Sequence, residues 1–150
     1  MNLSDIYSEL ILEHSKNTLN HRALDKADVV ENGHNPSCGD EISLQLKFDG
    51  DKIADASFTG HGCAISQAST SMMIDDIKGK SKEEALKLAN TFIDMITKKI
   101  TDDKQLEILG DAIVLKNISN MPARVKCAVL AWHTLKTTLE NDSKKNIDNN

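Results

Sequence analysis

The chain has few aromatic residues, few cysteines and no cluster of positive charge. Aromatic residues make up only 3% of its 150 positions, so the core must be built mainly from Leu, Ile, Val, Ala and Met. Three cysteines in a cytoplasmic protein do not indicate a disulfide framework, and they favour metal binding or catalysis instead.

Positive charge and hydrophobicity are both dispersed along the chain. The net charge is -5 and basic residues never follow one another in runs longer than two, which argues against nucleic acid as the main ligand. Apolar segments stay well below the ~20 residues needed to cross a bilayer, so we expect no membrane partner. The first residues lack the basic and apolar regions of a signal peptide, which favours a cytoplasmic location.

The length predicts a single domain with one core, because a chain of this size buries enough surface for one. We expect this domain to cover residues 1–140. The remaining segment, 141–150, is polar and is predicted to be a disordered tail.

The clearest strand signal is the alternation of apolar and polar residues over 42–48, followed by the hairpin dipeptide Asp49-Gly50. The return strand is predicted at 52–58, with Ala54, Ala56 and Phe58 on its buried side. Val29 and Val30 predict a short edge strand before this hairpin.

Helical periodicity surrounds the strands. The pattern predicts an amphipathic helix over 3–15, a helix from Cys63 or Ala64 to Ile77, and a helix from Ser81 with Glu84 in a capping box. For residues 101–119 the sequence predicts a short helical turn and then an irregular connection. Pro122 suits the first turn of the last helix. The predicted fold class is α+β: a small three-stranded antiparallel sheet with helices packed on one face.

Each cysteine lies at the edge of a predicted element. Cys38 lies in NPSCGD (residues 35–40), where Gly39 permits unusual backbone angles and Asp40 offers a further ligand. Cys63 lies at a helix start, where backbone N–H groups stabilise a thiolate. Cys127 follows Arg124 and Lys126 but has apolar neighbours, so in isolation it is better interpreted as a core cysteine.

Simple structural interpretations compete with a metal site. Cys38 could mark only a turn before a strand, and the spacing of the three cysteines is not that of a zinc finger. His61, two residues before Cys63, is the best alternative ligand among the histidines. The run of small hydroxyl residues at 66–71 lacks a histidine and an acid arranged around it, which favours a closely packed helix face.

The sequence segments around the three cysteines together resemble those of the U-type iron–sulfur cluster assembly proteins, the IscU/SufU family. The resemblance covers nearly the whole chain and is carried by NPSCGD at 35–40, GHGCAISQASTSMM at 60–73 and PARVKC at 122–127. It is closer to SufU of Gram-positive bacteria, because Lys126 stands where IscU has a histidine. The segment at about 102–120 resembles the extra segment of SufU-like chains. The segment MPARV at 121–125 departs from the chaperone-binding motif of IscU.

The resemblance implies a SufE/IscU-like fold and a zinc site formed by Cys38, Asp40, Cys63 and Cys127. It also implies that Cys38 is the catalytic residue and accepts persulfide sulfur from a SufS-like, PLP-dependent cysteine desulfurase. A downstream cluster scaffold would receive that sulfur. Arg124 and Lys126 either stabilise developing negative charge or are solvated residues at a helix start.

Three functions stay open from the sequence. One is a zinc-dependent sulfurtransferase that relays sulfur. A second is a scaffold on which a labile [2Fe–2S] cluster is built, since thiolates bind both zinc and iron. The third is a structural zinc domain that only binds a partner. Lys126 in the histidine position favours the first of these.

Overall fold

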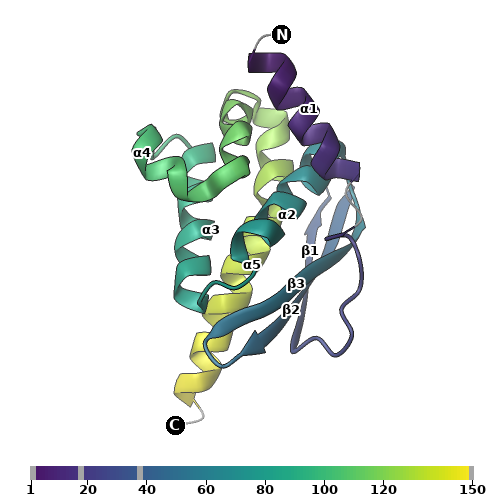
Figure 1. Ribbon diagram of the computed structural model, residues 1–150, viewed down its shortest axis with the longest axis vertical. Coiled ribbons are helices and arrows are strands. Elements are labelled where there is room, and N and C mark those ends of the chain that lie inside the picture. The colour runs from purple at the N-terminus through teal and green to yellow at the C-terminus, as the bar shows by residue number, and fades with distance from the viewer. Residues whose placement is uncertain (1–2, 17–18, 37–38, 149–150) are drawn as a thin grey trace.

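The computed structural model describes residues 3–16, 19–36 and 39–148. Figure 1 shows their arrangement, with the N-terminal helix at one end of the molecule and the last helix running to the other. The elements follow one another in this order: α1 (Leu3–Lys16), β1 (Val29–Asn35), β2 (Asp40–Asp49), β3 (Lys52–His61), α2 (Ala64–Ile77), α3 (Lys82–Ile96), α4 (Asp103–Leu106), the 3₁₀-helical segment η1 (Glu107–Asn120) and α5 (Pro122–Asp148).

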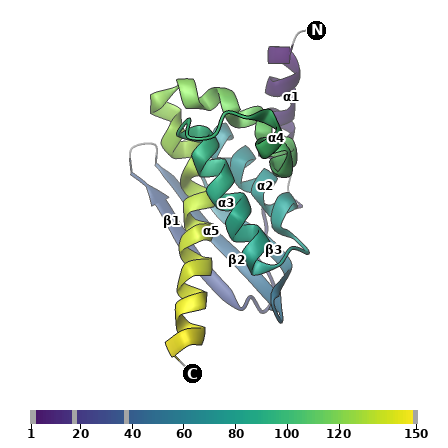
Figure 2. The same cartoon turned by 90° about the vertical axis from the view of Figure 1, so that its left-hand side faces the viewer.

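The three strands form one antiparallel sheet in the order β1-β2-β3. The hairpin between β2 and β3 turns at Gly50-Asp51, one residue later than the predicted Asp49-Gly50, because Asp49 still pairs with Lys52. β1 pairs with β2 as an edge strand. In Figure 2 the helices α3 and α5 lie in front of the sheet, and the strands lie behind them. The predicted α+β class, a small three-stranded sheet with helices on one face, is confirmed.

The inner side of β3 differs from the prediction. Phe48 pairs with Ile53 and Lys47 pairs with Asp55, so Ala54 is the extra residue of a β-bulge. Ile53 is fully buried, whereas Ala54 is exposed. The expectation that Ala54 faces the core is therefore wrong, because simple alternation does not allow for an inserted residue.

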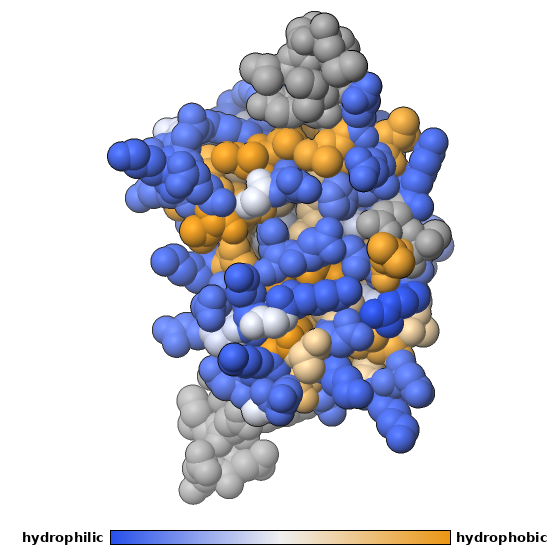
Figure 3. All heavy atoms as spheres, in the orientation of Figure 1, coloured by the Kyte–Doolittle hydropathy of each residue, from blue (hydrophilic) through white to orange (hydrophobic). Residues whose placement is uncertain are grey.

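The core lies between the sheet and the helices α2, α3 and α5. Trp132 of α5 is fully buried and stacks on Phe92 of α3, with ring centroids 4.2 Å apart. Its indole N–H donates to the Ser69 hydroxyl at 2.9 Å, and that hydroxyl donates to the Ala128 carbonyl at 2.6 Å. Hydrophilic residues cover most of the face in Figure 3, with hydrophobic residues visible in patches between them.

Helix ends agree with the local signals. The Ser81 hydroxyl accepts the N–H of Glu84 and the Glu84 carboxylate accepts the N–H of Ser81, which is the predicted capping box. The last helix begins at Pro122, as predicted, and it continues to Asp148. It therefore runs into the polar segment 141–150 for which the sequence predicts disorder. In the part of the chain that the structure describes, no helix is both long and apolar enough to cross a membrane.

Residues 107–120 are regular where the sequence predicts an irregular connection. They form the 3₁₀-helical segment η1, which is interrupted at Gly110 with φ 56° and ψ -131°. Leu109, Ala112 and Leu115 are fully buried. Tertiary packing of these apolar residues thus stabilises a conformation for which local periodicity gives little signal.

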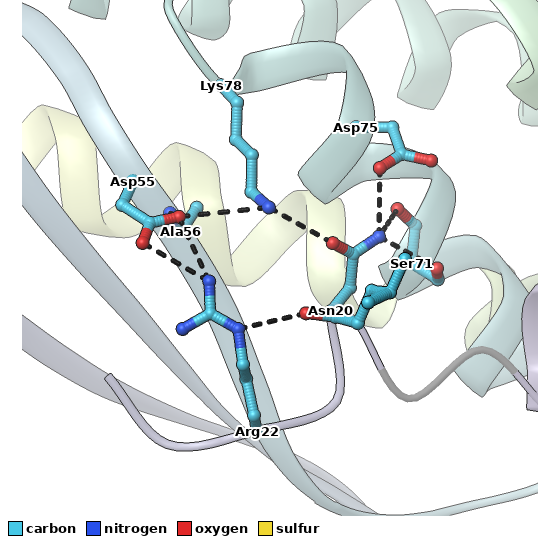
Figure 4. A network of polar contacts seen from close by, with 8 residues as sticks. Asn20, Arg22, Asp55, Ala56, Ser71, Asp75 and Lys78 are labelled. Carbon is cyan, nitrogen blue, oxygen red and sulfur yellow. Dashed lines mark hydrogen bonds and ion pairs between the residues drawn. The ribbon is translucent and has the colours of Figure 1, made fainter. Parts of the chain in front are cut away.

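A polar network attaches the segment after α1 to the sheet and to α2 (Figure 4). The Asn20 amide donates to Asp75 at 2.9 Å and to the Ser71 carbonyl at 3.1 Å, and its oxygen accepts from Lys78 at 3.2 Å. Backbone bonding extends the contact, since the Phe58 N–H donates to the Asn20 carbonyl at 2.9 Å. This segment therefore covers the outer edge of β3.

Asp76 is predicted to make stability depend on pH. Burial, with the charges of Asp75 and Asp111, raises its pKa from 3.8 to about 8, and Lys80 offsets this in part. The folded protein holds a proton that the unfolded chain releases above pH ~4, so stability falls as pH rises from ~4 through ~8. Asp76→Asn should flatten this fall and leave the variant more stable at pH 8 by a few kcal/mol, roughly.

Urea unfolding at pH 5 and pH 8 measures this effect, and Asp25→Asn, at an exposed carboxylate, is the matched control. An equal decline in stability for wild type and Asp76→Asn would contradict the assignment.

Candidate metal centre

Three of the predicted ligands come together where the sheet meets α2 and α5. One ligand atom each of Asp40, Cys63 and Cys127 lies within 4.8 Å of the other two. Asp40 begins β2, Cys63 precedes α2, and Cys127 lies in the second turn of α5. Asp40 and Cys127 are buried and Cys63 is partly exposed. These residues are 23 to 87 positions apart in the chain, so the fold alone assembles the group.

Cys63 is held at the N-terminus of α2. It occupies the N-cap position with φ -68° and ψ 167°, and its Sγ accepts the N–H of Ser66 at 3.4 Å. Its own N–H donates to Asp40 Oδ1 at 2.9 Å. The structure thus places Cys63 at a helix start, as the sequence predicts.

Asp40 presents a carboxylate oxygen without a partner to this group. The side chain is fully buried; Oδ1 accepts from Cys63, while Oδ2 has no hydrogen-bond partner among the described residues. A buried carboxylate with an unsatisfied oxygen is costly unless it is paired or binds a metal. In a tetrahedral zinc site two sulfur ligands lie about 3.8 Å apart, so ligand atoms within 4.8 Å of one another can reach this spacing by small movements. The donor set therefore fits zinc.

Position 62 must be a glycine, because Asp40 occupies the space that a larger side chain would need. A Cβ on Gly62 would lie 2.6 Å from Asp40 Oδ1 and 3.2 Å from Ser66 Oγ. The sequence alone does not indicate this contact, because Asp40 lies 22 positions before Gly62. Ser66, which donates to the Cys63 sulfur, was likewise interpreted only as part of a small helix face.

Cys38, the predicted catalytic residue, lies outside the described residues. The residue after it, Gly39, is described and has φ 69°, a left-handed conformation that favours glycine. This agrees with the predicted role of that glycine. Gly39 leads directly into β2 at Asp40. Cys38 lies two positions before Asp40 in the chain.

The histidines lie apart from the group. His61, the predicted alternative ligand, has a side chain that is 73% exposed and lies 3.6 Å from Glu41. His14 is buried, with Nδ1 3.3 Å from the Ser71 hydroxyl and Nε2 3.4 Å from Asp111. Neither contributes to the group that Asp40 and the two cysteines form.

Arg124 and Lys126 lie in the first turns of α5, before Cys127, and both are exposed. Their charges therefore lie in water, on residues within three positions of Cys127. Exposed charges of this kind act mainly on approaching ligands, because solvent screens them from buried atoms.

The comparisons with known proteins agree with this geometry. The family model of the NifU-like N-terminal domain matches residues 6–148, and the chain belongs to this family. Similar proteins are named for iron–sulfur cluster assembly or for sulfur transfer, and this chain accordingly falls in the IscU/SufU group of cluster assembly proteins.

Two relatives represent the two activities. The zinc-dependent sulfurtransferase SufU of Bacillus subtilis is 46% identical over 134 residues, which are 89% of this chain and 89% of the relative. The iron–sulfur cluster assembly scaffold protein IscU of Streptococcus pyogenes is 43% identical over 141 residues, 94% of this chain and 87% of the relative.

Solved structures show the same fold. A protein from Fervidobacterium islandicum, described as a cluster assembly scaffold for the SUF system, matches with a TM-score of 0.83 and 46% identity. The match covers 92% of this chain and 99% of that one. The NifU-like N-terminal protein of Brucella abortus, at 21% identity and a TM-score of 0.80, shows the fold alone.

Proposed function

We propose that this chain is a zinc-dependent sulfurtransferase that accepts persulfide sulfur on Cys38 from a SufS-like, PLP-dependent cysteine desulfurase. The observation that carries the proposal is the buried Asp40 carboxylate facing the sulfurs of Cys63 and Cys127 within 4.8 Å. The similarity to the Bacillus protein named a zinc-dependent sulfurtransferase supports it.

Four residues would hold the zinc ion: Cys38, Asp40, Cys63 and Cys127. When bound, zinc keeps its thiolate ligands deprotonated and is itself inert to oxidation and reduction. The protein supplies the rest: the N–H of Ser66 stabilises the Cys63 sulfur, and the N–H of Cys63 fixes the Asp40 carboxylate. The described ligands are therefore oriented before any metal binds.

The proposed reaction is thiol–persulfide exchange. The Cys38 thiolate attacks the outer sulfur of the donor persulfide; a new sulfur–sulfur bond forms on Cys38 as the donor's sulfur–sulfur bond breaks. The donor cysteine leaves as a thiolate and the transferred sulfur keeps its proton. The step is therefore balanced without an external oxidant or reductant. Arg124 and Lys126, exposed near Cys127, would favour the negative charge that passes between the two proteins.

The proposal includes a second partner and a location. A downstream cluster scaffold would take the sulfur from Cys38, since a persulfide acceptor must be emptied before it can act again. The chemistry requires reduced thiols, which the cytoplasm maintains.

The alternative is a scaffold that assembles and transfers a labile [2Fe–2S] cluster. It is favoured by the 43% identity to the Streptococcus scaffold protein, which is nearly as high as that to the sulfurtransferase. The same thiolates and carboxylate would then hold the cluster as cargo, and an oxygen ligand in place of a fourth thiolate would make that cluster easier to release.

Steady-state cysteine turnover by the partner desulfurase tests the proposal. With a thiol reductant present in every assay to empty Cys38 after each transfer, catalytic amounts of the zinc-loaded protein should accelerate turnover at least about tenfold over the reductant alone, because transfer to Cys38 replaces slow release of sulfur from the desulfurase. Cys38→Ala should abolish the acceleration, and the neighbouring Ser37→Ala serves as the matched control.

Two results would reject the sulfurtransferase. The first is acceleration that persists in Cys38→Ala. The second is sulfur release that depends only on added reductant, which would favour the scaffold and make anaerobic cluster reconstitution the next measurement. A structural zinc domain predicts no effect on turnover together with loss of the fold on chelation.

A further inference from the structure

Three metal-ligating side chains form a row on the sheet face opposite the thiolate group. His34 of β1 pairs directly with Glu41 of β2, which pairs directly with His61 of β3. Residues directly opposite each other in a ladder point to the same face. Glu41 follows Asp40, so the two carboxylates point to opposite faces of the same strand end. The row is thus separate from the group of Asp40, Cys63 and Cys127.

The Glu41 carboxylate lies between the two imidazoles, at the same distance from each. His34 Nε2 lies 3.6 Å from Glu41 Oε1, and His61 Nε2 lies 3.6 Å from Glu41 Oε2. Both separations are too long for good hydrogen bonds. In a tetrahedral zinc site with bonds of about 2.0–2.1 Å, two ligand atoms lie about 3.4 Å apart. Among the described residues only the thiolate group has its ligand atoms within 4.8 Å of one another, so the two imidazoles must move toward each other and the carboxylate to share one ion.

The side chains are free to close on an ion. They are 57%, 59% and 73% exposed for His34, Glu41 and His61, so small rotations meet little resistance. Each imidazole now faces a different oxygen of the carboxylate, and an ion above the carboxylate would draw both inward. The two histidines are separated by one strand, about 10 Å, which two imidazole side chains can span from opposite sides.

A hollow of about 400 Å³ opens beside the row. Its lining includes His34 and Glu41 together with Asn32, Ser43 and Gly60. Gly60 lacks a side chain, and the polar groups of Asn32 and Ser43 leave the hollow accessible to water. Three protein ligands and a water molecule make a four-coordinate open site.

A metal site accounts for the row better than a simple ion pair does. An exposed contact between a histidine and a carboxylate contributes little to stability, yet here one carboxylate has an imidazole on each side. Two imidazoles and a carboxylate suit zinc and similar first-row ions, whereas magnesium and calcium prefer oxygen ligands alone.

We propose that His34, Glu41 and His61 form a second metal site, which binds zinc or a similar divalent first-row ion on the outer face of the sheet. The site goes beyond the proposed sulfur transfer and does not depend on it. It is of the open kind, with two imidazoles, one carboxylate and a water molecule as ligands.

Cobalt(II) titration of the full chain, already loaded with one equivalent of zinc, tests the site. Cobalt bound to thiolates gives an intense sulfur-to-metal charge-transfer band, and cobalt bound to imidazole and carboxylate does not. We expect a second equivalent to bind without that band. Glu41→Gln, His34→Asn and His61→Asn should each weaken it by at least about tenfold. His133→Asn, at an exposed histidine on α5, should leave it unchanged.

Ring resonances of the histidines provide a second measurement. Those of His34 and His61 should shift together as the ion binds, while those of His133 stay in place. Binding of a single equivalent only, or a second equivalent that the three substitutions leave unchanged, would overturn the proposal. Neither result bears on sulfur transfer, which the desulfurase assay measures separately.

Discussion

Replacing Asp40 with asparagine should weaken zinc binding by at least about two orders of magnitude and yet stabilise the metal-free protein. Asp40 is fully buried, and its Oδ2 has no hydrogen-bond partner among the described residues. Without a metal, that oxygen is part of a buried charge that nothing described neutralises. Asparagine keeps the acceptor for the Cys63 N–H and removes the charge, so the metal-free fold gains stability as the metal site loses a ligand.

Two measurements together check this sign reversal. Competition with a chromophoric chelator gives the zinc affinity, and urea unfolding with and without chelator gives the stability of each state. With zinc in excess the wild type should be the more stable protein, because binding to the folded state adds to its stability. If Asp40→Asn is the less stable protein in both states, the carboxylate has a structural role that the metal does not explain.

Replacing Trp132 with alanine should destabilise the protein by about 3–5 kcal/mol, the usual cost of removing a large buried aromatic side chain. Trp132 is fully buried, stacks on Phe92 and donates to Ser69, so its removal leaves a cavity where α2, α3 and α5 meet. Trp132→Phe keeps most of the volume and loses the donor, and it should cost about 1–2 kcal/mol.

Unfolding in urea followed by circular dichroism measures both variants, since Trp132 is the only tryptophan and its fluorescence is lost with it. A loss below about 1 kcal/mol for Trp132→Ala would mean that the neighbouring side chains refill the site. In that case Ser69→Ala would also have little effect.

Much of the fold follows from local signals in the sequence. The Asp49-Gly50 signal, the Ser81 cap and Pro122 each depend on residues within a few positions. The structure has the cap and the proline as predicted, and it places the hairpin loop one residue later than predicted. The bulge at Ala54 and the 3₁₀ segment at 107–120 depend instead on packing against distant residues. Periodicity in a single segment does not contain that information.

The site, like the fold, has parts that local sequence signals predict and parts that depend on distant residues. The position of Cys63 at a helix start could be predicted from the glycines before it and the helical pattern after it. Cys127 in isolation looks like a core cysteine, and it is indeed only 1% exposed, yet its sulfur lies within 4.8 Å of ligand atoms of Asp40 and Cys63. Burial and ligation are compatible here, because the group lies where the sheet and two helices converge.

The bulge at Ala54 has a consequence for how the length of this chain can vary. Every neighbour of Ala54 in β3 keeps a partner in β2, and the bulge accommodates one residue between the pairs of Lys47 and Phe48. A chain without residue 54 would keep the same pairs and the same inward side chains. Insertions and deletions in relatives can therefore fall at this point of the hairpin, while His61 and Cys63 stay in place at the other end of the strand.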